Sequence, residues 1–168
     1  GMLPNGLQFF IQENRLPAHR AELRLVVRAG SVLEDDDQLG LAHFVEHMAF
    51  NGTVHFEKQE LVRRLEAMGM RFGADINAYT GFDETVYRLT VPTDQETFLA
   101  DAFQILEDWA QGITFDSVEV EKERGVVLEE WRLRQDAADR FFEEDFRMLL
   151  NGSRYAARFP IGTVESLQ

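Results

Sequence analysis

The sequence predicts an α+β fold in which an antiparallel-leaning sheet is covered by helices on one face. Strand-like alternation of apolar and polar residues occurs before residue 30 and between residues 75 and 91, and helical periodicity occupies most of the remainder. The 168 residues, 45% of them apolar, are enough to form one hydrophobic core. Because the sequence contains no internal repeat, we expect residues 1–168 to form a single domain.

Two strands are predicted near the start of the chain. Residues 7–11 and 23–27 each alternate apolar with polar side chains, which is typical of half-buried strands. The segment between them, 13–20, contains Asn14 and Pro17, and both residue types favour turns. We therefore expect the two strands to form a hairpin.

Two helices are expected to follow. The apolar periodicity becomes helical from residue 39 to residue 50, and Asn51-Gly52 then stops it. Residues 57–68 place apolar side chains on one helical face, and Gly69 follows as a stop signal.

A second pair of strands and a third helix come next. Residues 75–80 and 84–91 show strand-like alternation on either side of Gly81. Thr93-Asp94 then resembles a helix start, and Gly112 resembles the corresponding stop. The apolar stripe of this helix consists of Phe98, Ala102, Ile105 and Trp109.

The last part of the chain is predicted to be mainly one long helix. From Asp116 the sequence is charged and helical in period for more than thirty residues. Gly125 lies within it, at a cost of about 1 kcal/mol relative to Ala that a long helix can absorb. From Asn151 onward the pattern is irregular.

Composition excludes several classes of partner and site. Thirty acidic against seventeen basic residues give a formal charge of −13, which repels phosphate backbones and anionic lipid, so we expect no nucleic-acid partner. No run approaches the roughly 20 apolar residues of a membrane span, so we expect none. The absence of cysteine excludes disulfides and thiolate metal sites.

The stretch His43-Phe44-Val45-Glu46-His47 is the most informative in the chain. Residues four apart on a helix lie on the same face, so His43 and His47 can reach one zinc ion. Glu46 lies close to that face and can act as a base toward a water molecule without ligating the metal. The spacing therefore indicates a metal site, and the alternative is a helix whose histidines are merely capped or solvated.

A catalytic zinc usually has three protein ligands, so one more must come from elsewhere. His19 and His55 lie in expected loops, where a solvated surface position is the better interpretation. Glu123, Glu129 and Glu130 lie on the charged helix and could each supply a carboxylate. Spacing alone does not choose among these three.

The combined motifs resemble the pitrilysin and insulinase family of inverted-motif zinc peptidases. The resemblance covers nearly the whole chain and rests on four segments: Gly40–Met48, Phe50–Thr53, Asn77–Thr80 and Glu123–Glu130. Residues 70–87 look closest to the bacterial PqqL-like branch of that family. The fold implied is the pitrilysin and mitochondrial-processing-peptidase-like domain, incomplete at its C-terminal end.

The resemblance implies a role for each site residue. His43, His47 and Glu130 would ligate one Zn²⁺, Glu46 would be the catalytic base, and Glu123 would be a supporting carboxylate beside the ligands. In the family, the strand that corresponds to Asn77 and Ala78 lies beside the substrate, so it would pair with an extended peptide. The alternative for Asn77 is a residue placed for the turn at Gly81.

The expected function is therefore zinc-dependent endopeptidase activity on peptide substrates. The resemblance also implies that C-terminal domains of the same protein complete the active chamber, so this chain alone should be poorly active or inactive. It favours a bacterial periplasmic location over a cytoplasmic one. Two alternatives are a non-catalytic scaffold or partner-binding homologue and a metal-binding module without hydrolysis.

Overall fold

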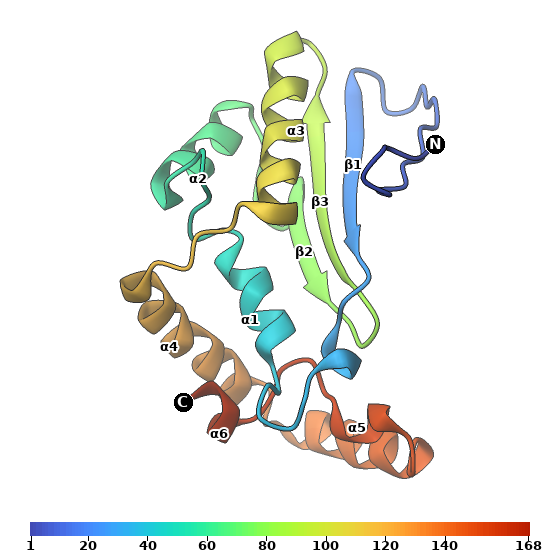
Figure 1. Cartoon of the computed structure of the whole chain (residues 1–168), viewed down its shortest axis with the longest axis vertical. Helices are drawn as coiled ribbons and strands as arrows, with labels where there is room; N and C mark the ends of the chain where they lie inside the picture. The colour runs from blue at the N-terminus through green and yellow to red at the C-terminus, as the bar shows by residue number, and fades with distance from the viewer.

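The structure is a computed structural model that describes residues 1–168, apart from the side chain of Gln59. Figure 1 shows helices gathered around a small sheet, with the two termini far apart. In chain order the elements are β1 (Arg20–Val27), η1 (Ser31–Leu33), α1 (Leu41–Met48), α2 (Lys58–Ala67), β2 (Ile76–Thr80), β3 (Thr85–Pro92), α3 (Glu96–Gln111), α4 (Ser117–Leu133), α5 (Ala137–Leu149), η2 (Arg154–Ala157) and α6 (Val164–Leu167).

The sheet is antiparallel, and its strand order across the described residues is β1-β3-β2. Leu25 of β1 and Ala78 of β2 both pair with Tyr87 of the central strand β3. In β1, partly buried and exposed residues alternate, so one face of this strand is covered and the other faces solvent. The predicted α+β class and the antiparallel sheet are thereby confirmed.

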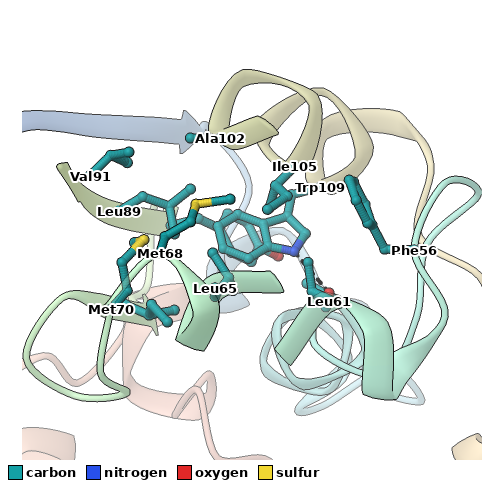
Figure 2. Close-up of a cluster of buried hydrophobic side chains, with 13 residues drawn as sticks. Phe56, Leu61, Leu65, Met68, Met70, Leu89, Val91, Ala102, Ile105 and Trp109 are labelled. Atoms are coloured by element: carbon teal, nitrogen blue, oxygen red, sulfur yellow. Dashed lines mark hydrogen bonds between the residues drawn. The ribbon is translucent and has the colours of Figure 1, made fainter. Parts of the chain in front are cut away.

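The hydrophobic core lies between the sheet and helices α2 and α3 (Figure 2). Leu61 and Leu65 of α2 and Ile105 of α3 are fully buried there, at the spacings that place apolar residues on one helical face. The indole of Trp109 packs against Phe50 and Tyr87, and its Nε1 donates a hydrogen bond to the carbonyl oxygen of Ala49 at 2.8 Å. The core thus fixes the C-terminal end of α1.

Helix α1 lies between α4 and the sheet, and the strand of the sheet that it contacts most is β2 (Figure 1). This places the predicted metal-binding helix, the predicted substrate strand and the glutamate-bearing helix next to one another. None of the helices in the described part of the chain combines the length and apolar character that a membrane crossing requires.

The predicted strand at residues 7–11, and with it the hairpin to β1, is wrong. In this region the structure has only an isolated bridge between Met2 and Gln8. The side chains of Phe10 and Ile11 are 91% and 88% exposed. Alternating apolar and polar residues form a strand only where a neighbouring strand is available for pairing. Residues 7–11 pair with neither β1 nor any other strand of the described residues.

The single long helix predicted from Asp116 is also wrong, because α4 ends at Leu133 and α5 begins at Ala137. The Asp136 side chain accepts hydrogen bonds from the backbone N–H groups of Ala138 and Asp139, which makes it the N-cap of a new helix. Gly125 lies within α4 and does not interrupt it, as expected. The tail from Asn151 is less irregular than predicted, because it includes η2 and α6.

Candidate metal centre

Helix α1 begins at a left-handed Gly40 whose φ is 88°. The carboxylate of Glu34, from the preceding loop, accepts hydrogen bonds from the backbone N–H groups of Gly40 at 2.9 Å and Ala42 at 2.8 Å. Two of the otherwise unpaired N–H groups of the first turn are satisfied in this way. Glu34 therefore stabilises the start of α1 and helps to orient the helix that carries His43 and His47.

Three possible ligand atoms from two helices converge at this site. His43 Nε2 and His47 Nε2 of α1 lie 3.2 Å apart. Glu130 Oε2 of α4 lies 3.3 Å from His47 Nε2 and 3.6 Å from His43 Nε2. The three side chains form a group that could hold a metal ion.

These separations fit a tetrahedral zinc site. With zinc–ligand bonds of about 2.0–2.1 Å at tetrahedral angles, ligand atoms lie about 3.3–3.4 Å from one another. The observed range of 3.2–3.6 Å brackets this value. Two imidazoles and one carboxylate leave a fourth position for water or substrate, as catalytic zinc sites require.

The charges around the two histidines also favour a cation. Burial lowers the pKa of His47, but hydrogen bonds and charges from Glu123 and Glu130 outweigh burial and raise this pKa to about 9. Burial and the neighbouring His47 lower the pKa of His43 to about 4. One positive charge is therefore favoured between the rings and the carboxylates, and a metal ion can supply it.

The orientation of His47 is defined by Glu123. His47 Nδ1 lies 2.8 Å from Glu123 Oε1. Burial raises the pKa of Glu123, but hydrogen bonds from His47 and Asn51 outweigh it, so the net pKa is lowered and the carboxylate is ionised. Because an ionised carboxylate only accepts, Nδ1 of His47 carries the proton, and in the neutral ring Nε2 keeps its lone pair for a metal.

Glu46 lies on the same helix, buried beside the histidines. Its Oε2 accepts a hydrogen bond of 2.7 Å from the hydroxyl of Thr80, at the end of β2. Burial raises the pKa of Glu46, and the Thr80 hydrogen bond opposes this rise. A buried carboxylate with a raised pKa has the character of a general base that works near neutral pH.

The predicted substrate strand lies next to these groups. A cavity of about 340 Å³ is lined by the four residues His43, Glu46, His47 and Glu130, and by residues 78–80, Arg134, Pro160 and Ile161. Since β2 is an edge strand, one side of Ala78 is paired with β3 and the other is not. Asn77 is exposed, and its Oδ1 accepts from the backbone N–H of Ala78 at 2.9 Å.

Other candidates lie away from the cluster. Glu129 pairs with Arg132 on the outer face of α4. His19 is exposed near Asp94. His55 contacts the buried carboxylate of Asp108 at 2.7 Å, so it has a partner where a merely solvated residue was expected.

Three residues that contact the cluster were not given a role by sequence reasoning. The sequence pattern marks Asn51 as a helix stop and as part of the resembling segment Phe50–Thr53, and neither feature gives it a role beside His47. Apart from the place of Thr80 in the resembling segment Asn77–Thr80, the sequence did not indicate that this residue contacts the site. Arg134, which lies 2.5 Å from Glu130 Oε1, follows that glutamate by four residues on one charged helix, and many exposed ion pairs share this spacing.

Comparison with known proteins shows which family the chain is similar to. The model of the insulinase family, peptidase family M16, matches residues 9–151, a range that contains His43, Glu46, His47, Glu123 and Glu130. The chain belongs to this family. The crystal structure of pitrilysin is similar to this chain. It superposes with a TM-score of 0.72 at 26% identity, covering 90% of this chain and 16% of pitrilysin.

Several curated relatives match the chain along almost its whole length. The probable zinc protease PqqL of Haemophilus influenzae is 44% identical over 168 residues, which are 100% of this chain and 18% of that protein. The zinc protease PQQL-like of Arabidopsis thaliana is 43% identical over 162 residues, covering 96% of this chain and 17% of that protein. The chain therefore spans less than a fifth of these relatives.

A solved M16 structure gives a similar result. The first half of the periplasmic protease PqqL from Escherichia coli superposes with a TM-score of 0.95 at 42% identity, covering 99% of this chain and 36% of that one. Together with the family match, this confirms the predicted resemblance and the predicted fold, and the chain matches only part of each of these longer relatives.

Proposed function

We propose that this chain carries the zinc-binding site and the general base of a zinc metalloendopeptidase. The convergence of His43, His47 and Glu130 at tetrahedral separations, with Glu46 beside them, is the observation that supports it. The description of the relatives as zinc proteases agrees with this proposal. When bound, zinc would supply Lewis acidity that activates water and polarises a peptide carbonyl.

The side chains of this chain would divide the remaining work. Glu46 accepts the proton of the attacking water and returns it to the leaving amine, which a single buried carboxylate can do in succession. The hydroxyl of Thr80 keeps the second oxygen of Glu46 hydrogen-bonded, so its carboxylate cannot rotate freely. Glu123 orients His47.

The substrate in this proposal is an extended peptide that adds to the sheet beside β2. Residues 78–80 of β2 line the cavity that contains Glu46 and the two histidines, and within the described residues β2 lies at the edge of the sheet. Main-chain hydrogen bonds to Asn77 and Ala78 would place a carbonyl group of the peptide over that cavity. Such pairing recognises backbone, so it does not by itself select a peptide sequence.

We further propose that residues 1–168 form a single, partial N-terminal peptidase domain that needs later domains of the same protein for efficient turnover. The length of the relatives supports this view. The similar Escherichia coli protein is described as periplasmic, and by this resemblance we propose a periplasmic location.

Metal content and hydrolysis should be measured separately. The purified chain is expected to hold about one zinc per molecule by elemental analysis, and the double variant His43→Ala, His47→Ala none. In the longer protein, Glu46→Gln is expected to retain zinc and lose hydrolysis of an unstructured peptide, because only the base is removed.

The two alternatives give different results in the same assays. A metal-binding module would hold zinc in the parent chain while the longer protein hydrolysed no peptide. A non-catalytic scaffold would show neither property. Hydrolysis that survived Glu46→Gln would exclude Glu46 as the base and require another residue in that role.

A further inference from the structure

Asn51 lies just beyond the C-terminal end of α1, buried between α1 and α4. Its side-chain amide donates one hydrogen bond to the carbonyl oxygen of His47 at 3.1 Å and another to Glu123 Oε2 at 2.8 Å. An amide nitrogen carries two hydrogens, so both bonds can be made at once. Asn51 therefore contacts both members of the His47–Glu123 pair.

The two oxygens of Glu123 have different partners. Oε1 lies 2.8 Å from His47 Nδ1, and Oε2 accepts from Asn51. A carboxylate held at both oxygens cannot rotate about its terminal bond without breaking one of these part-buried hydrogen bonds, which is unfavourable. The direction in which Glu123 meets the ring of His47 thus depends on Asn51.

The chemistry of this position requires a neutral side chain with two donors. An aspartate here would present a second carboxylate to Glu123 and repel it, since like charges in contact are unfavourable. An alanine would leave Glu123 Oε2 without its donor in a half-buried place.

We propose that Asn51 is a positioning residue of the metal centre: it holds Glu123 so that the Nδ1–H of His47 stays hydrogen-bonded and Nε2 stays turned toward His43 and Glu130. This inference deepens the proposed function and rests on the metal site, not on peptide hydrolysis. Asn51 touches neither metal nor substrate, and it acts through two intervening side chains.

The test is the zinc affinity of the purified chain, measured by competition with a chelator of known affinity. Loss of a group that orients a ligand typically weakens metal binding by about 10- to 100-fold. We expect Asn51→Ala to fall in this range and Asn51→Asp to be weaker still. Asn151→Ala, an exposed asparagine beyond α5, is the matched control and should bind like the parent.

A double-mutant cycle separates positioning from a general structural role. If Asn51 acts through Glu123, then Asn51→Ala should change zinc affinity little in a Glu123→Ala background. Urea unfolding of the metal-free variants identifies any that fail to fold.

The outcomes distinguish this inference from the proposed function. A parent chain that binds no zinc overturns both. Zinc binding by the parent that is unchanged in folded Asn51→Ala and Asn51→Asp overturns the role of Asn51 and leaves the metal site intact. Equal losses from Asn51→Ala with and without Glu123 also overturn it, because the effect would then not pass through Glu123.

Discussion

The hydroxyl of Thr80 lies 2.7 Å from Glu46 Oε2 and links the last residue of β2 to the buried glutamate of α1. The same strand borders the cavity at Ala78, so one element contacts the proposed base and lines the cavity proposed for the substrate. Movement of β2 would therefore change the position of Glu46. If a substrate pairs with β2 as proposed, this hydrogen bond would couple that pairing to the orientation of Glu46.

Replacing Thr80 by Val should lower kcat for peptide hydrolysis by the longer protein. A hydrogen bond to a charged group contributes about 1.5–3 kcal/mol, so the expected loss is about tenfold to a hundredfold. Thr80→Ser keeps the hydroxyl and should retain most of the activity. Steady-state kinetics with one peptide would test this, and equal rates for Val and Ser variants would contradict it. Zinc content should not change in either variant.

Much of the fold could be predicted because local pattern and tertiary packing agree. Residues 57–68 place Leu61 and Leu65 on one face, and that face is buried in the structure. The prediction fails where a segment has a strand-like pattern but no neighbouring strand to pair with. Residues 7–11 have the alternation of a strand, but a strand also needs a neighbouring edge, and sequence pattern does not reveal whether one is present.

One residue in the sequence indicated the break between α4 and α5, but the helical periodicity around it favoured one continuous helix. Asp136 is a good N-cap residue, yet charged residues on both sides continue the helical pattern and make one long helix the simpler interpretation. For the candidate site, helical spacing is sufficient to bring His43 and His47 together. Spacing within one helix could not show that Glu130 of α4 meets them, because that depends on how two helices pack.

The adjacent residues Glu129 and Glu130 offer a direct test of the third ligand. Glu130 Oε2 faces the two histidines, whereas Glu129 pairs with Arg132 away from them. Glu130→Gln should therefore reduce zinc affinity by far more than tenfold, since it removes a ligand charge. Glu129→Gln should bind zinc as the parent does. A chelator competition assay measures the zinc affinity of both variants. A larger loss of affinity in Glu129→Gln than in Glu130→Gln would show that Glu129 is the third ligand.

The core should depend strongly on Leu65, which is fully buried between α2 and the sheet. Leu65→Ala is expected to lower the free energy of unfolding by about 2–5 kcal/mol, because it loses transfer energy and leaves a cavity. Its neighbour Glu66 is exposed, so Glu66→Ala should change stability by about 0.5 kcal/mol or less. Urea unfolding of the metal-free chain measures both, and similar losses for the two would contradict the core described here.

Asp108 provides a prediction about acid stability. Its side chain is 1% exposed and accepts hydrogen bonds from the Thr53 hydroxyl at 2.5 Å and from two groups of His55. Burial raises the pKa of Asp108, but the hydrogen bonds from Thr53 and His55 outweigh it, so its pKa is lowered from the usual 3.8. A carboxyl with a lowered folded pKa stabilises the fold above its unfolded pKa and loses that contribution as pH falls through the folded pKa.

The difference in unfolding free energy between the parent and Asp108→Asn should therefore be largest near pH 6, at about 1–3 kcal/mol. It should shrink as pH is lowered from about 5 toward 3, because the parent then becomes protonated like its neutral replacement. Urea unfolding at half-unit pH steps measures it. Thr53→Val, which removes one of the donors that lower this pKa, should show a weaker acid dependence than the parent. A difference that stayed constant or grew toward pH 3 would show that Asp108 is not held in its charged form.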